Sequence, residues 1–416
     1  MINFKKVLGI LFIVTLLVSV NPIFGADWPM FQNNLDHSGF TEENSNFVIN
    51  LWTHDMGSSI SSTPAICDNV LYAISGNGLL KAINLENGTE DFSYDFSSKV
   101  TASPVIQDNV LYVGADNGVF YAFDLENQTI KWTYGTSKPI ESTASIVDNV
   151  VYFGSDNGHV YALNANDGSV KWDSTLGGKI ISSPAISDNY LYVGSTNGNL
   201  YSLNTNDGSI DFSYVSADSI VSSPAVHDDI VAFGSEDNNL YVLNTTEGSL
   251  IWQQGMENKI SSSPTIDSYD NSIYIGSDSG NLTNFDLRDG TFKWSYKSGA
   301  AVESTPALSN GTVIFTSNEG SAYVLNEYTG DVEFSYNPGT MLFNSPIHAS
   351  PVLNGNCLIL AGQDGYLYSL NLEKNEAPAS IFLYYAIAVL IVVVAALIVV
   401  VKVLKVKSKK GNKKDK

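Results

Sequence analysis

The chain has 416 residues and a formal net charge of −22, with 15% charged, 44% hydrophobic and 11% aromatic residues. This apolar, aromatic composition excludes a disordered chain, and the acidic excess excludes a protein that coats nucleic acid, so no nucleic-acid partner is expected. Two cysteines exclude a disulfide scaffold and any cysteine-rich zinc or iron–sulfur module.

The first 26 residues have the order of a secretory signal peptide. Lys5 and Lys6 precede an apolar run over 7–20, and the small residues Gly25 and Ala26 follow. We therefore expect residues 1–26 to be a signal peptide cleaved near Ala26. The alternative is an uncleaved N-terminal anchor.

Residues 27–375 are predicted to form one domain, because a single unit recurs eight times in them. The string Ser-Ser-Thr-Pro-Ala that ends at Ala65 returns in related form at steps of 40 to 45 residues. Ala144 takes the place of the proline in one unit. The prolines of the other units stand at positions 64, 104, 184, 224, 264, 306 and 351.

Each unit continues with three further strands. An apolar strand such as 110–113 is followed by an Asp-Asn-Gly turn at 116–118 and a third strand at 120–124. Asn-Gly and Asp-Gly turns accept positive φ and close tight hairpins. Four short strands in about 40 residues predict a blade of a β-propeller, an all-β fold.

Aromatic residues mark the outermost strand of each unit and give the number of blades. The sequence has eight inner-strand motifs, but only seven of these aromatic residues follow the first motif. They are Phe92, Trp132, Trp172, Phe212, Trp252, Trp294 and Phe334. The eighth unit ends without such a strand, and Leu51-Trp52 precedes the first unit. We therefore predict an eight-bladed propeller whose N-terminal strand closes the last blade; the alternative is an open or seven-bladed ring with a degenerate end.

The C-terminal region has the pattern of a single membrane anchor. Residues 381–401 contain no charge, and at about 1.5 Å per residue they would cross the apolar core of a bilayer as a transmembrane helix. The segment 402–416 holds eight lysines and marks a cytoplasmic tail. Residues 376–380 are a short linker. This pattern predicts a single-pass protein of the cell membrane with an extracellular propeller; a buried soluble helix is the alternative.

The formal charge divides between these parts. Residues 27–378 hold 42 acidic and 11 basic residues, a net charge of −31, whereas the tail has a net charge of +7. The predicted exported domain is therefore an acidic surface and the tail a basic anchor.

The repeat resembles that of the pyrroloquinoline-quinone-type (PQQ-like) β-propellers. The resemblance rests on Val-Tyr-Ala-Leu-Asn-Ala-Asn-Asp-Gly-Ser-Val-Lys-Trp at 160–172 and on Trp-Pro-Met-Phe at 28–31, followed by His-Ser-Gly at 37–39. It extends from Asp27 to about Asn375. The family includes quinone-dependent alcohol dehydrogenases, the BamB lipoprotein and many surface proteins, so it implies the fold more closely than the function. This chain would be a BamB-like, membrane-anchored form.

The enzymes of that family hold the quinone between a tryptophan and a disulfide of adjacent cysteines, with calcium beside it. Here Cys67 and Cys357 are far apart in the sequence, and no haem-attachment motif occurs. We therefore predict no catalytic, cofactor-binding or metal-binding residue, and we expect neither PQQ nor calcium. A disulfide between the two cysteines across the ring closure is one alternative; we favour two separate thiols, because their places in the repeat differ by three residues.

The variable positions of the repeat are the candidates for a binding site. A hydroxyl precedes every proline or its replacement, whereas the position three before it varies freely. This variable row comprises Ser61, Thr101, Glu141, Ile181, Val221, Ser261, Glu303 and His348. We call it the rim row and expect it to surround one mouth of the propeller, with Glu141, Glu303 and His348 as its specific polar groups. The alternative is neutral variation at a solvated rim.

Five sequons mark candidate N-glycosylation sites in predicted turns or at strand ends. Their asparagines are Asn87, Asn127, Asn244, Asn281 and Asn310.

These patterns together predict a cell-surface, membrane-anchored propeller that acts as a non-enzymatic binding or scaffolding module. Its expected partner is an envelope or surface protein or a glycan. The alternatives are a quinone-dependent dehydrogenase-like enzyme or a hydrolase that uses the propeller mouth, and a ligand sensor.

Overall fold

The computed structural model describes residues 40–41, 48–309, 311–339 and 345–372, and all regular secondary structure within them is β-strand. None of these residues belongs to a helix long and apolar enough to cross a membrane. The predicted signal peptide, the linker 376–380, the span 381–401 and the tail lie outside the described residues.

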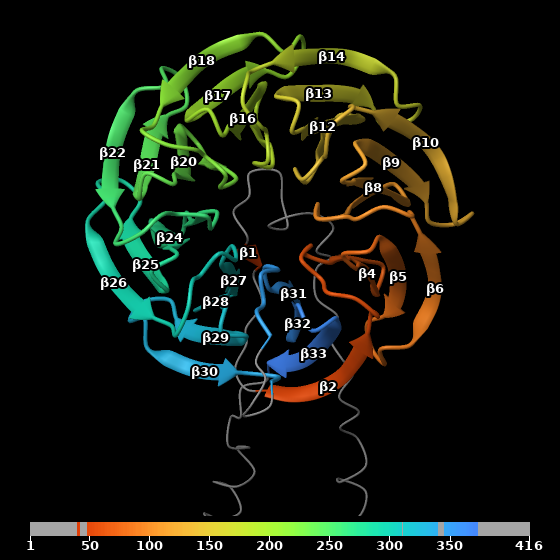
Figure 1. The fold of residues 1–416 in the computed structure, drawn as a ribbon. Coiled ribbons are helices and arrows are strands. Elements are labelled where there is room, and N and C mark those ends of the chain that lie inside the picture. Colours follow the sequence, from red (N-terminus) through yellow and green to blue (C-terminus); the bar gives the residue numbers. More distant parts are fainter. Residues whose placement is uncertain (1–39, 42–47, 310, 340–344, 373–416) are drawn as a thin grey trace, which may run out of the picture. The chain divides into compact units, whose positions relative to one another are not determined.

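The strands form eight sheets, each with four antiparallel strands that follow one another from the axis of the ring outwards, as predicted (Figure 1). The innermost strands are β3 (Ala65–Cys67), β7 (Val105–Gln107), β11 (Ser145–Val147), β15 (Ala185–Ser187), β19 (Ala225–His227), β23 (Thr265–Asp267), β27 (Ala307–Ser309) and β31 (Val352–Asn354). The second strands are β4 (Val70–Ile74), β8 (Val110–Gly114), β12 (Val150–Gly154), β16 (Tyr190–Gly194), β20 (Ile230–Gly234), β24 (Ser272–Gly276), β28 (Thr312–Ser317) and β32 (Cys357–Ala361).

The outer half of each blade follows the same order. The third strands are β5 (Leu79–Asn84), β9 (Val119–Asp124), β13 (His159–Asn164), β17 (Asn199–Asn204), β21 (Asn239–Asn244), β25 (Asn281–Asp286), β29 (Ser321–Asn326) and β33 (Tyr366–Leu372). The outer strands are β6 (Glu90–Asp95), β10 (Thr129–Gly135), β14 (Val170–Thr175), β18 (Ile210–Val215), β22 (Leu250–Gly255), β26 (Phe292–Lys297), β30 (Val332–Tyr336) and, in blade 8, β2 (Val48–Asp55).

The N-terminal strand closes the ring as the sequence predicted. β2 pairs antiparallel with β33, and Trp52 lies opposite Ser369 (Figure 1). The predicted hydroxyl row adds a second closure nearer the axis. The backbone N–H of Ser350 in blade 8 donates to Thr63 Oγ1 in blade 1 over 3.1 Å, and Thr63 N–H donates to Ser103 Oγ in blade 2 over 2.9 Å. Equivalent bonds join blades 2 to 3, 3 to 4, 4 to 5, 5 to 6 and 7 to 8.

One strand was not predicted. The two-residue strand β1 (Phe40–Thr41) pairs in parallel with β27 and makes blade 7 a five-stranded sheet. A strand of this length has no periodic pattern that sequence reasoning could find.

The hydrophobic core lies between adjacent blades, and the outer-strand tryptophans join them. The indole Nε1 of Trp132 in blade 2 donates to the carbonyl of Ala165 in blade 3 over 2.9 Å, and Trp172 donates likewise to Thr205 in blade 4. Trp132 packs against Gly168, which has φ +72° and lies in the turn that follows the third strand of blade 3. The turn glycine therefore permits both the positive φ and the close approach of the ring.

Candidate functional site

The rim row lies at the inner ends of the segments that enter each blade. Ser61 is exposed and the other seven residues are half-buried. The next position along the chain in each unit is a buried serine or alanine, and the one after it belongs to the hydroxyl row. The rim row therefore lies two residues before the hydroxyl row in every unit.

The structure brings two of the three predicted polar groups together. His348 Nδ1 lies 3.0 Å from Glu303 Oε2, although 45 residues separate the two in sequence. They contact because blades 7 and 8 are neighbours. The hydrogen bond from His348 and a second one from Asn318 hold the pKa of Glu303 below its usual range, against the opposing effect of burial. Each of the two side chains is still about one-third exposed to solvent.

Glu141 does not join this pair. It enters blade 3, four blades from Glu303 in a ring of eight, and so lies on the opposite side of the axis. Burial, and next the negative charge of Asp156, raise the pKa of the Glu141 carboxyl. Asp156 is itself only 6% exposed and binds Lys179 through Oδ2 at 2.6 Å. The two glutamates therefore occupy different electrostatic surroundings.

A second row of acceptors lies beside the rim row, and sequence reasoning missed it. Asp156, Asp278 and Asn318 occupy equivalent positions in the turns that follow the second strands, where each backbone N–H donates to a carbonyl of the segment that enters the blade. In each, one side-chain oxygen, Oδ1, is buried and has no hydrogen-bond partner among the described residues. Because such an acceptor is costly to leave unpaired, it favours a bound donor.

Asp116, at the same position in blade 2, has a partner for each of its side-chain oxygens. Its Oδ1 accepts from the hydroxyl of Thr101 over 3.1 Å, and its Oδ2 binds Lys99 at 2.9 Å. In blade 3 the rim residue is Glu141, which replaces that hydroxyl donor with a carboxyl group. In the sequence, Asp and Asn at this position indicate only turns.

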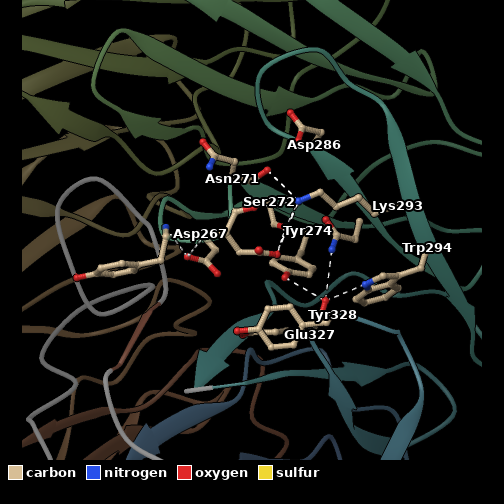
Figure 2. Close-up of polar contacts among 12 residues, drawn as sticks. Asp267, Asn271, Ser272, Tyr274, Asp286, Lys293, Trp294, Glu327 and Tyr328 are labelled. Atoms are coloured by element: carbon tan, nitrogen blue, oxygen red, sulfur yellow. Dashed lines mark hydrogen bonds and ion pairs between the residues drawn. The ribbon is translucent and has the colours of Figure 1, made fainter.

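The other end of the blades holds a second polar cluster, at the interface of blades 6 and 7 (Figure 2). Asp267 and Glu327 are 3% and 4% exposed. Burial is the main cause that raises the pKa of each carboxyl group. The Glu327 carbonyl accepts from Trp294 Nε1 over 2.8 Å and from the Tyr274 hydroxyl over 3.4 Å. Tyr328 stands beside Glu327 with 62% of its surface exposed.

The candidate cofactor residues do not fit a quinone held between adjacent cysteines. Cys67 ends β3 in blade 1 and Cys357 begins β32 in blade 8, and no disulfide joins the two, as favoured from the sequence. Within the ranges that the structure describes, no three His, Cys, Asp or Glu side chains form a group that could hold a metal ion. No reaction step is therefore derived through a quinone.

Four of the five sequons lie in the described part of the chain. Asn87 and Asn127 are exposed in turns of blades 1 and 2. Asn244 and Asn281 are half-buried at strand ends, and Asn281 Nδ2 binds Glu257 Oε2 over 3.2 Å. Asn310 lies outside the described residues.

The fold and the inter-blade contacts define an eight-bladed β-propeller. A family model for the β-propeller of the beta-alanine-activating enzyme matches residues 149–395, and one for outer membrane protein assembly factor BamB matches residues 50–178. The chain belongs to the family of PQQ-like repeat β-propellers and has a BamB-like repeat. No curated protein matches its sequence significantly.

Solved structures of this fold have diverse roles. BamB from Moraxella catarrhalis is 16% identical with a TM-score of 0.67, and the match covers 78% of this chain and 100% of that one. Quinohemoprotein alcohol dehydrogenase from Comamonas testosteroni is 13% identical with a TM-score of 0.72, covering 83% and 80%. The computationally designed Ika8 protein is 18% identical with a TM-score of 0.69, covering 79% and 100%. At these identities the likeness shows the fold alone.

Proposed function

We propose that this protein is a non-enzymatic binding or scaffolding module that binds its partner at the rim row. The supporting observation is the set of buried, unpaired Oδ1 atoms in the turns beside the rim row. Those of Asp278 and Asn318 lie in blades 6 and 7 near the Glu303–His348 pair, and that of Asp156 lies across the ring near Glu141. All three are acceptors, so a partner that offers N–H or O–H donors would satisfy them. These acceptors would recognise a partner through hydrogen bonds, and this role requires no catalytic residue.

The partner that fits best is a protein of the same envelope that presents basic side chains. Residues 27–378 have a net charge of −31, which attracts a basic partner and accelerates its association. A glycan, which offers hydroxyl donors without charge, is the other ligand of this chemistry. The match to an outer membrane assembly factor favours a role in assembly, by analogy with that protein.

We propose that the module is exported by a signal peptide at 1–26 and is held at the cell membrane by the segment 381–401, with 402–416 in the cytoplasm. Only about nine residues separate Asn371 from this span, and they extend at most about 30 Å. The propeller would therefore lie close to the membrane, within reach of other envelope components.

Crosslinking and pull-down of the full-length protein from its native membrane test this proposal. The wild type is compared with a Glu303→Gln/His348→Gln variant and with Glu126→Gln, a control in an exposed turn of blade 2. We expect a defined partner with the wild type and the control, at least tenfold depleted with the double variant. Equal recovery from all three proteins would overturn the placement of the site.

A separate measurement distinguishes a binding module from a quinoprotein enzyme. The purified full-length protein is incubated with PQQ and calcium, and its absorbance spectrum and its reduction of a dye with alcohols are recorded. We expect neither a bound-quinone spectrum nor alcohol-dependent dye reduction. Either signal would replace the binding-module proposal with the enzymatic alternative.

A further inference from the structure

A pocket of about 150 Å³ lies between blades 4 and 5, on the side of the ring opposite the rim row. Among the residues that line it are Asp188, Asp211, Asp228, Tyr190, Tyr192 and Thr245. A cavity of this volume can hold a molecule of the size of benzene. The lining combines three carboxylates with hydroxyl groups. It therefore favours a small, positively charged molecule that has hydrogen-bond donors.

The pocket coincides with a break in the repeat. In blade 3 the outer-strand residue is Trp172, whose indole donates to the carbonyl of Thr205 in blade 4. Its equivalent in blade 4 is Phe212, which is smaller and has no N–H to donate. Ser202 lies opposite both Phe212 and Tyr192 across the sheet. Ser202 is fully buried beside Tyr192, which lines the pocket.

Blade 6 shows how an ammonium group occupies the equivalent place. Asp211 of β18 and Lys293 of β26 are both the second residue of an outer strand, at the register shift before the aromatic residue. Lys293 Nζ donates to the carbonyls of Asp270 and Asn271 over 3.0 and 3.1 Å and to Ser272 Oγ over 2.8 Å (Figure 2). Blade 6 therefore supplies its own cation at this turn, whereas blade 4 has a carboxylate there.

Blade 1 shows that acidity alone does not make the pocket. Asp68, Asp91 and Asp108 stand at the positions of the three pocket aspartates. The residue of the next blade that corresponds to Thr245 is Leu125, which is apolar and only 7% exposed. The interface of blades 1 and 2 therefore lacks the polar wall of the pocket. This interface can serve as a control for the pocket between blades 4 and 5.

We propose that the pocket between blades 4 and 5 binds a primary ammonium group, from a small alkylamine or from a lysine side chain. An ammonium group has three N–H donors and one positive charge. Asp188, Asp211 and Asp228 neutralise this charge. The four-carbon chain of butylamine or of lysine lies against Tyr190 and Tyr192. Because the carboxylates are exposed at the entrance, binding weakens as salt is added. The site is independent of the rim row.

The test uses the full-length protein in detergent with methyl-labelled threonine, since Thr245 and Thr246 line the pocket. It is titrated with n-butylammonium chloride, with n-butanol as a neutral control of the same length. A blocked Gly-Lys-Gly peptide forms the second arm. We expect saturable shifts of the Thr245 and Thr246 methyl signals with the amine, and none with butanol. Binding of the peptide at least as tight as that of the amine assigns a lysine side chain; binding of the amine alone assigns a small amine.

Two variants and a matched control locate the effect. Asp211→Lys places a lysine where blade 6 has Lys293, and Phe212→Trp fills the space that the missing indole leaves; each should weaken amine binding at least tenfold. Asp91→Lys makes the same charge change at the equivalent position of blade 1 and should leave binding within twofold of the wild type. Unchanged Thr245 and Thr246 signals in the wild type, equal shifts with butanol, or equal affinity in Asp211→Lys would each overturn the proposal.

Discussion

Replacing Gly168 with alanine tests the contact that joins blade 2 to blade 3. Gly168 has φ +72°, and a Cβ there would lie 2.6 Å from Cε3 of Trp132. The left-handed conformation costs a residue with a side chain roughly 1–2 kcal/mol, and overpacking costs about 1–3 kcal/mol more. Trp132 is 9% exposed and is held by its bond to Ala165, so the ring cannot easily move away. We expect a total loss of about 2–5 kcal/mol in the free energy of unfolding.

Gly57→Ala is the matched control for the backbone effect. Gly57 has φ +76°, and nothing lies within 4 Å of the Cβ that alanine would add. Thermal unfolding of the full-length proteins is followed by circular dichroism at one scan rate, because proteins of this size often unfold irreversibly. At about 1–2 °C per kcal/mol for a domain of this size, we expect midpoint decreases of about 2–10 °C for Gly168→Ala and about 1–4 °C for Gly57→Ala.

Equal decreases in the two variants would refute the reasoning. They would mean that Trp132 moves aside without cost, so that the indole and the turn glycine are not a close-packed contact between blades. A decrease specific to Gly168→Ala would instead assign the difference to packing, because both variants share the penalty of positive φ.

Three further changes probe the closure, the buried acid and the indole bond. Thr63→Val removes the acceptor of Ser350 N–H and should cost about 1–3 kcal/mol, with faster amide hydrogen exchange at Ser350. Burial raises the pKa of Glu327 above its usual 4.5; the folded state thus keeps this proton longer than the unfolded chain, and stability falls as pH rises past that value. Glu327→Gln should make this fall smaller in unfolding midpoints measured between pH 4 and pH 7, because the pKa values of Asp267 and Glu141 are raised as well. Trp172→Phe removes the donor to Thr205 and leaves a gap, and should lower stability in denaturant unfolding by about 1–3 kcal/mol.

For each of these three predictions, one result would contradict it. Thr63→Val is compared with Thr143→Val, which breaks the bond from Ser103 within the ring; equal exchange at Ser350 in both would show that the closure does not depend on this bond. A Glu327→Gln protein with the same pH dependence as the wild type would show that this carboxyl does not titrate differently on folding. A Trp172→Phe protein as stable as the wild type would show that the interface of blades 3 and 4 tolerates the loss of the indole. The interface of blades 4 and 5, which has Phe212 at this position, already lacks it.

The architecture was predictable because its causes are local and repeated. The spacing of the prolines gave the number of inner strands, and the aromatic positions gave the outer ones, so the surplus of one inner motif identified Trp52 as the closing residue. The role of Gly168 was only half visible. Its positive φ follows from the turn motif, but the contact with Trp132 joins two different blades and is not encoded in either turn alone.

The site was less predictable, because neighbouring blades combine residues that are distant in sequence. The contact of Glu303 with His348 follows from their shared position in adjacent units, whereas Glu141 at the same position lies across the ring. The unpaired oxygens of Asp156 and Asp278 could not be found from the sequence. A rim hydroxyl, that of Thr101, pairs with Asp116 Oδ1 in blade 2. Blade 6 also has a rim hydroxyl, Ser261, yet Asp278 Oδ1 has no partner, so neither the rim residue nor the turn motif predicts the pairing.

Departures from the repeat are most informative where several fall on one interface. A single change, such as Phe92 for tryptophan in blade 1, is accommodated because Leu125 supplies an apolar wall. In blade 4, Phe212 is combined with Thr245 in blade 5, and an acidic pocket results. In blade 6, Lys293 is present and the corresponding space holds an internal ammonium group. In the described blades the same backbone site therefore occurs in three forms: an apolar wall in blade 1, an internally bonded ammonium group in blade 6 and a pocket between blades 4 and 5. Of these three, the pocket has room for a molecule from outside.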